Sequence, residues 1–466
     1  MSRLFLRGAI ITMQKRKGDG KMPDELTVAK ENKPAKKQDK DYDIGCVPSN
    51  WWYHCVGENL LVKIIAAYTN IKVKPDPDYL KEEGPIIVIS NHESYLDPVI
   101  TSMLTRGRPG NFVTGEFVFR KEPWAHWFKL GGAIPKKQFV VDTISVKAMM
   151  KVMKRKGVLF IYPEATRCVD GSTITFDDGV AKMAKKAGAA IYIAHIHGAY
   201  LTMPRWSPGS IRRGKITAEF VRKLPGEEVK KMSAEEIHQY ILDGIRYNEN
   251  DYARENSPVH KGKDLAKGLQ NVAYICPKCR SEFTMQWVSA EGGDKIRCSK
   301  CANTVRYLPS GLLEGATSED KSFDDLSKWT AWEKELVAEE LAKGDFHMEL
   351  DADLFKVYDP LTFAKTGKGK VTINSAEVIY EGTDCDAQVG IPYKKGKPLP
   401  KFKNRTLEGV SRPIRQVFEI SSMKGLVSSY GKYFEIYSKD GELFRFYVDG
   451  HKVYKVQKVV KLLGRN

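Results

Sequence analysis

The sequence predicts three structural parts in order: an α/β domain, a small module built on four cysteines, and a mostly β C-terminal domain. Three observations support this order. Strand-like and helix-like segments alternate between about residues 85 and 225, which is typical of α/β folds. Cysteines occur as two close pairs after residue 270. From about residue 345 onward, apolar and polar residues alternate with the period of a β-strand.

Length and charge limit what the protein can be. The chain has 466 residues, enough for about three domains, and 42% of them are hydrophobic, enough to bury a core. The formal net charge of +17 indicates an anionic partner, such as a phospholipid surface, a nucleic acid or an acidic protein. No apolar run approaches the roughly 20 residues that span a bilayer, so we expect any membrane contact to be peripheral.

Two segments precede the first predicted strand. Residues 1–45 are polar and rich in lysine, and we expect them to be largely disordered, with a short basic membrane-touching segment as the alternative. Residues 50–69 predict a helix that is apolar over most of its surface. Trp51 and Trp52 suit a water–lipid interface, but the same helix could pack on the sheet, and the sequence leaves both alternatives open.

Apolar runs bounded by turn residues define the strands of the α/β domain, and apolar residues at helical spacing define its helices. The expected strands are 85–90, 111–114, 158–162, 189–196 and 215–222. The expected helices are 98–105, 121–130, 142–156, 177–187 and 233–248. In the helix 142–156, four apolar side chains recur at helical spacing, so we expect them in the core. They are Val146, Met149, Met150 and Met153.

A first candidate motif, Ser90 to Pro98, follows the strand predicted at 85–90. Asp97 followed by Pro98 is typical of a helix start, with the Asp as N-cap. On a continuous helix, residues five apart lie about 140° apart and would not meet. On a strand-to-helix loop, however, the Asp97 carboxylate can reach His92. We therefore expect this pair at the carboxyl end of a strand, where open α/β sheets bind ligands.

The chemistry of such a pair is proton transfer. Histidine has an unperturbed pKa of about 6.5, and a carboxylate on one ring nitrogen fixes its tautomer and stabilises the imidazolium. A histidine held in this way can remove a proton from a substrate hydroxyl without a Ser or Cys nucleophile. A histidine and an aspartate five residues apart are often incidental, so the flanking strand and helix start carry much of this interpretation.

Two further segments carry charged residues at predicted loops. Arg167 follows the strand predicted at 158–162 and suits bidentate capture of a phosphate, while Glu164 could bind a hydroxyl or hold Arg167. Lys136 and Lys137 close a glycine-containing segment and could add positive charge for a phosphate. For all four residues, solvated surface is the alternative interpretation.

Taken in order, the blocks Asn91–Asp97, Gly132–Lys137 and Tyr162–Arg167 resemble those of the glycerolipid acyltransferases, specifically the 1-acyl-sn-glycerol-3-phosphate acyltransferases. The resemblance covers about residues 50–225 and implies a mixed sheet flanked by helices. Three ordered blocks are far more specific than any one of them. The resemblance therefore gives the α/β domain a candidate activity.

This sequence departs from the family pattern at three places. Glu93 stands where Gln is usual, and Ala165 where Gly is usual, so we expect the third loop to differ slightly in backbone geometry. Lys136 or Lys137 stands where the second block usually ends in Arg. Lysine keeps the charge but loses the planar fork, which puts the phosphate contact in doubt.

The resemblance implies a reaction. His92, oriented by Asp97, would deprotonate the free hydroxyl of lysophosphatidic acid or a related lysophospholipid, and the alkoxide would attack an acyl thioester of coenzyme A or acyl carrier protein. The product would be phosphatidic acid or a related phospholipid, made in phospholipid biosynthesis at the cytoplasmic, inner face of a membrane. The residues expected to bind the substrate are Asn91, Lys136, Lys137, Glu164 and Arg167.

The paired cysteines predict a structural zinc ribbon. The four residues are Cys276, Cys279, Cys298 and Cys301. Two C-x2-C turns can present four thiolates to Zn²⁺ in a tetrahedron, which leaves no open position for catalysis. Such spacing in a large chain favours metal over disulfides, and hence a reducing, cytoplasmic compartment. Ribbons often bind protein or nucleic acid, and here we favour a linker or protein contact.

The C-terminal part begins with a helix expected at 330–344 and ends with one at 451–463. The strands between them, with a hairpin turn at 439–441, resemble a pleckstrin-homology (PH) or GRAM-like barrel. The expected domains are a disordered basic segment at 1–45, the acyltransferase domain at 46–250, a linker at 251–270, the zinc ribbon at 271–308, a linker and helix at 309–344, and the β-rich PH/GRAM-like domain at 345–466.

Three functions remain open at this point. The first is an enzyme that transfers acyl groups. The second is a catalytically inactive, membrane-associated scaffold that binds partners through its zinc ribbon and C-terminal domain. The presence of both His92 and Asp97 favours the enzyme, since a scaffold has no need of the pair. Nucleic-acid binding through the +17 net charge is the least favoured.

Overall fold

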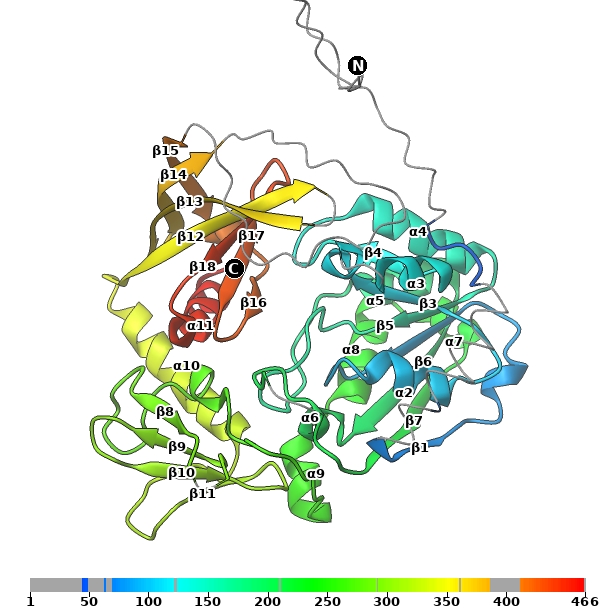
Figure 1. The fold of residues 1–466 in the computed structure, drawn as a ribbon. Coiled ribbons are helices and arrows are strands. Elements are labelled where there is room, and N and C mark those ends of the chain that lie inside the picture. The colour runs from blue at the N-terminus through cyan, green and yellow to red at the C-terminus, as the bar shows by residue number, and fades with distance from the viewer. Residues whose placement is uncertain are drawn as a thin grey trace, which may run out of the picture. The chain divides into compact units, whose positions relative to one another are not determined.

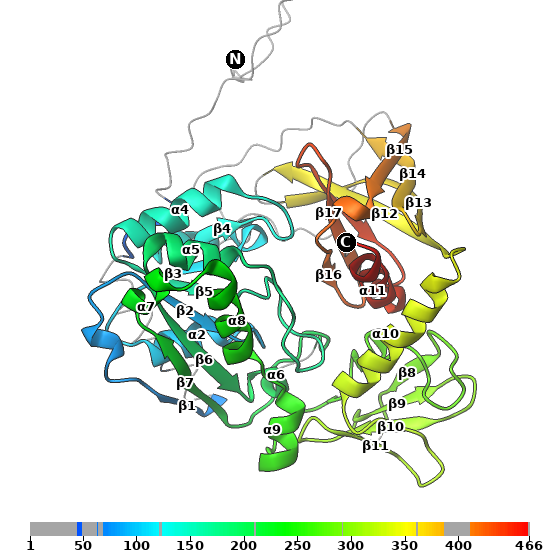
Figure 2. The ribbon, with the colours of Figure 1, turned by 180° about the vertical axis from the view of Figure 1, so that it is seen from behind.

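The computed structural model describes residues 44–48, 63, 69–120, 124–208, 211–290, 292–359, 362–385 and 411–464. The predictions for residues 1–45 and for a helix at 50–69 fall almost wholly outside these ranges. The described strands form three sheets, which Figures 1 and 2 show from opposite sides. Among the described residues, none of the helices has the length and apolar character that a membrane crossing requires.

The first sheet has seven strands in the order β1-β7-β6-β2-β5-β3-β4. Their bounds are β1 (Ile71–Lys74), β2 (Ile86–Ser90), β3 (Asn111–Gly115), β4 (Ile134–Lys136), β5 (Val158–Ile161), β6 (Ala190–His197) and β7 (Ile216–Leu224). The β6–β7 pair is antiparallel and the other pairs are parallel, which confirms the mixed sheet. The carboxyl ends of β2, β3, β4, β5 and β6 therefore share one edge of the sheet.

Helices cover both faces of this sheet (Figures 1 and 2). The helices of this part of the chain are α2 (Asp97–Leu104), α3 (Trp124–Leu130), α4 (Thr143–Lys154), α5 (Gly179–Ala187), α6 (Ala199–Thr202), α7 (Gly226–Lys231), α8 (Ala234–Ile245) and α9 (Glu249–Asn256). On one face, Ile87 and Ile89 pack in a core cluster with α4, α5 and α8. On the other face, α2 packs against β6 and β7. This alternation buries every residue of β2, the strand that leads into the first block.

Two expectations about the helices were wrong. Asp97 is the first residue of α2, not its N-cap, because its carboxylate binds the backbone of the preceding loop. Val146 is 47% exposed, because the buried stripe of α4 runs through Ser145, Met149 and Val152 and leaves Val146 at its margin.

The second sheet contains the paired-cysteine module. Its strands, in the order β11-β10-β9-β8, are β8 (Met285–Val288), β9 (Lys295–Cys298), β10 (Thr304–Tyr307) and β11 (Leu313–Gly315). The sheet thus extends beyond residue 308. The stretch expected as a linker at 251–270 contains most of α9 and buries Leu265 and Leu269. Both stretches expected to contain linkers therefore contribute residues to a sheet or a core.

The third sheet is antiparallel, in the order β15-β14-β13-β12-β18-β17-β16. Its strands are β12 (His347–Asp359), β13 (Thr362–Asn374), β14 (Glu377–Cys385), β15 (Ser411–Glu419), β16 (Val427–Ser429), β17 (Tyr433–Tyr437) and β18 (Leu443–Tyr447). The hairpin turn between β17 and β18 is confirmed, with Gly441 at φ +81°. The expected helices are α10 (Leu326–Ala342) and α11 (Val453–Leu463). The likeness to a PH or GRAM barrel stays a prediction.

The second and third sheets share one hydrophobic core cluster with α10 and α11. A buried ion pair between Glu333 of α10 and Lys458 of α11 lies within it. The other Glu333 oxygen accepts the backbone N–H groups of Tyr274 and Ile275 at 2.8 and 2.9 Å. Glu333 therefore ties the chain that enters the cysteine module to the C-terminal helix.

Candidate active site and metal centre

His92 and Asp97 meet on the loop between β2 and α2. His92 Nδ1 lies 2.7 Å from Asp97 Oδ2, and the same carboxylate accepts the backbone N–H groups of Glu93 and Ser94 at 2.7 and 3.0 Å. The loop thus folds around a fully buried carboxylate, which brings residues five apart into contact. The His92 side chain remains 21% exposed, so the imidazole reaches the surface while its partner does not.

The third block holds His92 from the neighbouring strand. The Tyr162 ring, which follows β5, stacks on the imidazole with ring centroids 4.4 Å apart. The His92 N–H donates to Glu164 Oε1 at 2.9 Å, and the His92 carbonyl accepts the Cys168 N–H at 2.8 Å. Tyr162 was not singled out as a site residue, because its sequence position shows no contact with His92. These bonds fix the first block against the third.

The surroundings of His92 favour its neutral form. Burial lowers the pKa of His92, and this effect outweighs the hydrogen bond and charge of Asp97, which raise it. The positive charges of Arg167 and Arg205 lower the pKa further. Since the unperturbed value is about 6.5, the imidazole is mostly neutral near pH 7 and able to accept a proton.

Asn91 and Glu164 were expected to contact substrate, but the structure buries both beneath the loops. Asn91 Nδ2 donates to Ile196 O at 2.9 Å, and Asn91 Oδ1 accepts the Ile196 N–H at 2.8 Å. The second oxygen of Glu164 accepts the Ile174 N–H at 2.7 Å, and burial raises the pKa of Glu164 to about 8. Their polar atoms are occupied by the protein itself and hold the loops in place, so a contact with substrate stays a prediction.

Glu93, the departure from Gln in the first block, is also fully buried. Burial raises its pKa well above the usual range, and nearby carboxylates raise it further. It accepts hydrogen bonds from Asn91 Nδ2 at 2.9 Å and from the Cys168 thiol at 2.8 Å. Burial thus disfavours a negative charge on Glu93, the residue that stands where the neutral glutamine is usual.

Arg167 presents an unpaired positive charge beside His92. Its guanidinium lies 3.7 Å from the centre of the Tyr95 ring, and Tyr95 is 58% exposed. Burial lowers the pKa of Arg167, and the charge of Arg205 lowers it as well. Within the described ranges, Arg167 forms no ion pair. An anion that reaches this surface would therefore find a guanidinium that is already partly desolvated.

Arg205 is a second guanidinium that the sequence did not reveal. Its Nη1 donates to the Arg167 carbonyl at 3.0 Å, and its Nη2 donates to the Ser428 carbonyl at 2.9 Å. It too forms no ion pair with any residue that the structure describes. Nothing in its local sequence, Pro204-Arg205-Trp206, resembles a binding motif, so only the fold identifies it. Arg205 thus contacts Arg167, whose guanidinium lies over the exposed Tyr95 ring, and the charges of both arginines act on His92.

Gln138, the residue after the second block, contacts the third block through its side chain. The Gln138 amide donates to the Ala165 carbonyl. Lys136 Nζ lies 3.4 Å from the Lys137 carbonyl, and burial lowers the pKa of Lys136. Lys137 Nζ lies 5.8 Å from the centre of the Tyr437 ring. Neither ammonium group contacts Arg167 in the described part of the chain, so a direct role in phosphate binding stays a prediction.

Ala165 has a backbone conformation that is uncommon for a residue with a side chain. Its φ of +58° lies in the left-handed region that Gly usually occupies. For a non-glycine residue, this conformation costs about 1 kcal/mol of free energy relative to the right-handed one. The Ala165 N–H donates to the Tyr162 carbonyl at 3.1 Å, which helps to hold the turn. The expected difference from the family's loop geometry at this position stays a prediction.

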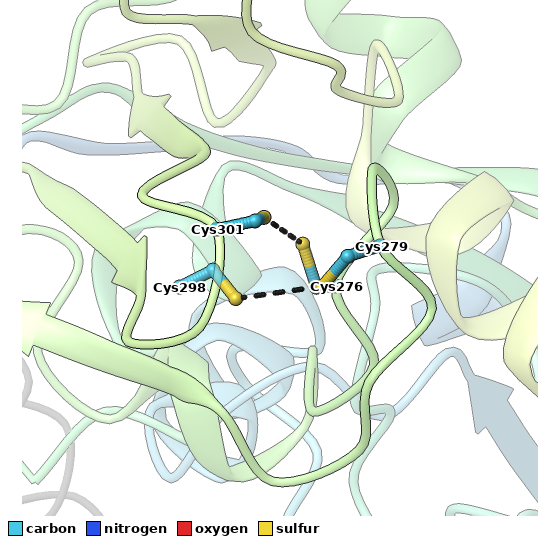
Figure 3. A group of neighbouring side chains, drawn as sticks. All are labelled: Cys276, Cys279, Cys298 and Cys301. Atoms are coloured by element: carbon cyan, nitrogen blue, oxygen red, sulfur yellow. Dashed lines mark hydrogen bonds between the residues drawn. The ribbon is translucent and has the colours of Figure 1, made fainter.

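The four cysteines of the ribbon converge on one point (Figure 3). All four sulfur atoms lie within 4.8 Å of one another, with Cys276 to Cys301 at 3.6 Å and Cys279 to Cys298 at 3.7 Å. A zinc–sulfur tetrahedron with bonds of about 2.3 Å has sulfur–sulfur edges of about 3.8 Å. The thiolate set and its spacing therefore fit Zn²⁺.

The backbone around each cysteine pair repeats the same turn. Arg280 and Ala302, which follow the second cysteine of each pair, have φ of +58° and +61°. Their N–H groups donate to the carbonyls of Cys276 and Cys298 at 2.9 and 3.0 Å. Two matching turns that face each other present four sulfurs from opposite sides, as a structural metal site requires.

Comparisons with known proteins cover the α/β domain. Residues 71–196 match a family model described as Acyltransferase. A chloroplastic 1-acyl-sn-glycerol-3-phosphate acyltransferase of Arabidopsis thaliana is 30% identical over 152 residues, which is 31% of this chain and 41% of that protein. A chloroplastic counterpart from Brassica napus is 29% identical over 152 residues, 31% of this chain and 42% of that protein.

Two further similarities are more distant. A 1-acyl-sn-glycerol-3-phosphate acyltransferase of Chlamydomonas reinhardtii is 26% identical over 181 residues, covering 37% of this chain and 50% of that protein. The crystal structure of the 1-acyl-sn-glycerophosphate acyltransferase of Thermotoga maritima is 19% identical, covers 42% of this chain and 80% of that one, and has a TM-score of 0.34. The chain thus spans no more than half the length of the curated relatives it matches.

Proposed function

We propose that this chain, whose residues 71–196 form a domain of the acyltransferase family, moves a fatty acyl group from a thioester to the free hydroxyl of lysophosphatidic acid or a related lysophospholipid. The observation that carries the proposal is the 2.7 Å contact between His92 and the buried Asp97, beside two unpaired arginines. A base and an anion site on one surface match an acceptor that has both a hydroxyl and a phosphate.

The proposed reaction begins with proton transfer to His92 Nε2, because Nδ1 is held by Asp97. The acceptor oxygen then attacks the thioester carbonyl, forming a new C–O bond and a tetrahedral intermediate. When the intermediate collapses, the C–S bond breaks and the thiolate of coenzyme A or acyl carrier protein leaves. The His92 imidazolium returns the proton to that thiolate, and Asp97 stabilises the imidazolium while it exists.

The acceptor phosphate would bind at Arg167, with its planar fork of N–H donors. Stacking on Tyr95 fixes the guanidinium plane at the protein surface, where a lipid headgroup can reach it. The inactive-scaffold alternative gains no support from this arrangement, because a scaffold does not require an ordered base next to an unpaired arginine. Comparing lysophosphatidic acid with related lysophospholipids in a transfer assay would identify the acceptor.

A pH profile tests the role of His92 as a base. Only the neutral imidazole can accept the proton, so kcat/KM should rise with pH as His92 loses its own proton. Since burial lowers the pKa of His92 below 6.5, the rise should be complete before neutral pH. Initial rates between pH 4.5 and 8.5 would measure this. A profile that rises only above pH 8 would contradict a neutral histidine base.

The exposed start of α4 is a candidate contact for an anionic membrane. Val141 and Ile144 are 83% and 66% exposed, and Val146 is 47% exposed. α4 contains no acidic residue and presents three exposed lysines, Lys147, Lys151 and Lys154. Apolar side chains that insert among lipids, next to lysines that attract acidic headgroups, favour peripheral binding. This surface directly follows the second block, so it would bring the acceptor lipid close to the site.

Replacing Val141 and Ile144 together by Asp should therefore weaken membrane binding. We expect the fraction that co-sediments with vesicles of 70% phosphatidylcholine and 30% phosphatidylglycerol to fall by at least about threefold, since two charges replace two inserting side chains. The matched control is the double variant Val221→Asp/Val259→Asp, which replaces two exposed valines outside α4. It should sediment with vesicles to the same extent as the wild type. Equal sedimentation of all three proteins would rule out this surface.

A further inference from the structure

Arg205 joins the acyltransferase domain to the C-terminal sheet. It follows α6, outside the residues that match the family model. One side of its guanidinium donates to the Arg167 carbonyl and the other to the Ser428 carbonyl of β16. The guanidinium carbon lies 4.9 Å from the centre of the Tyr430 ring. The C-terminal domain thus supplies both a hydrogen-bond acceptor and an aromatic face to this arginine.

The C-terminal residues that hold Arg205 are themselves fixed. The Tyr430 hydroxyl donates to Gln457 Oε1 of α11 at 2.6 Å, and the Ser428 hydroxyl donates to the same oxygen at 2.9 Å. Tyr430 is buried, at 8% exposure. A rigid support of this kind determines where the guanidinium can lie, because the arginine side chain alone has many rotamers.

Further contacts run along the loops of the site. Lys424 Nζ pairs with Asp177 at 3.0 Å, and the Tyr437 hydroxyl lies 3.5 Å from Glu116 Oε2. A small cavity of about 70 Å³ lies between residues 138–140, which follow the second block, and the C-terminal sheet. The C-terminal domain therefore borders the segments that follow the second and third blocks, well beyond the single contact at Arg205.

The charges at this border favour a bound anion. Arg167 and Arg205 repel each other, and both disfavour a positive charge on His92. Neither guanidinium forms an ion pair with a carboxylate among the described residues. Two like charges held side by side in a partly buried site cost free energy, and a bound phosphate would remove that cost. A guanidinium has five N–H donors, so Arg205 keeps donors beyond those that face Arg167 and Ser428.

We propose that the C-terminal sheet forms one wall of the acceptor site and holds Arg205 where, together with Arg167, it binds the acceptor phosphate. In this arrangement Arg205 is a binding residue, and Tyr430 is a positioning residue. The inference rests on the proposed acyl transfer. It assigns the C-terminal domain a part in the choice of phosphate-bearing acceptors.

Steady-state kinetics of Arg205→Met test this proposal. We expect KM for lysophosphatidic acid to rise about 10- to 100-fold, as for loss of a charge-assisted hydrogen bond, with kcat changed less than about threefold. Arg205→Lys should recover part of the loss, and Tyr430→Leu should raise KM less than Arg205→Met does. With monoacylglycerol, which has no phosphate, none of the three variants should change KM.

The control is Arg415→Met, an exposed arginine of the same C-terminal sheet that pairs with Glu381, and it should match the wild type. The thermal shift caused by lysophosphatidic acid without donor gives a second readout, which should shrink in Arg205→Met but not in Arg415→Met. If Arg205→Met raised KM equally for both acceptors, or left KM and the thermal shift unchanged, Arg205 would not bind the phosphate and its role would be purely structural. A different result would contradict the proposed reaction itself: a wild-type protein that transfers no acyl group to any acceptor.

Discussion

His92→Ala is expected to lower kcat by about 10²- to 10⁴-fold, the usual contribution of a general base. The fold should survive, because the backbone N–H and carbonyl of His92 keep their bonds to Glu164 and Cys168. The variant does leave one oxygen of the buried Asp97 carboxylate without its imidazole partner. We therefore expect a modest loss of thermal stability alongside the large loss of turnover. Product formation and a thermal melt would measure both.

The matched control for this variant is His126→Ala. His126 is an exposed histidine on α3, and its ring contacts Trp127 rather than a carboxylate. It should turn over acceptor at the wild-type rate. If His92→Ala keeps more than about a tenth of wild-type kcat, a loss too small for a general base, then His92 does not act as the base.

Removal of zinc should produce the largest loss of stability. The ribbon lies in the same core cluster as α10, α11 and the third sheet, so loss of the metal should spread beyond the ribbon. Structural zinc in small modules contributes on the order of 10 kcal/mol. We expect protein purified under reducing conditions to hold about one zinc per chain. Chelation, or Cys298→Ser, should lower both the zinc content and the melting temperature.

Cys46→Ser provides the control, since Cys46 lies outside the four-cysteine group. It should keep the zinc content and the melting temperature of the wild type. Wild-type protein that contains no zinc, yet melts at the same temperature with and without added zinc, would remove the structural metal from this account.

The sequence predicted the first block well, because local rules decide its geometry. A buried strand, a short loop and a helix start follow one another between residues 86 and 98, so contact between His92 and Asp97 required no distant residue. The cysteine pairs were equally local. In both cases the residues that meet are close in sequence and held by standard turns.

Other features of the site depend on tertiary structure and were missed. Arg205 reaches the site from 38 residues beyond Arg167 and is held by Ser428, 223 residues further on. Burial also cannot be seen in a motif, which is why the bonds of Asn91 and Glu164 to the backbone were not expected. β4 was not expected, because its three residues include Pro135, which argues against a strand.

Tertiary structure also adds to what composition shows at the expected linkers. Polar and glycine-containing composition predicted linkers, and within these stretches Leu265, Leu269 and Leu313 of the strand Leu313–Gly315 contribute to one core. A few apolar residues in a polar stretch are enough to anchor it when a neighbouring sheet offers a surface. The division into domains by residue number therefore stays a prediction, although each of the three sheets is clear.

The central claim is that His92, oriented by Asp97, moves an acyl group onto a hydroxyl of a phosphate-bearing lipid. The most direct test is to incubate the full chain with lysophosphatidic acid and a labelled thioester of either coenzyme A or acyl carrier protein, and to identify the lipid formed. The account predicts labelled phosphatidic acid from at least one donor, absent with His92→Ala. No labelled product above the His92→Ala background, with either donor, would contradict it.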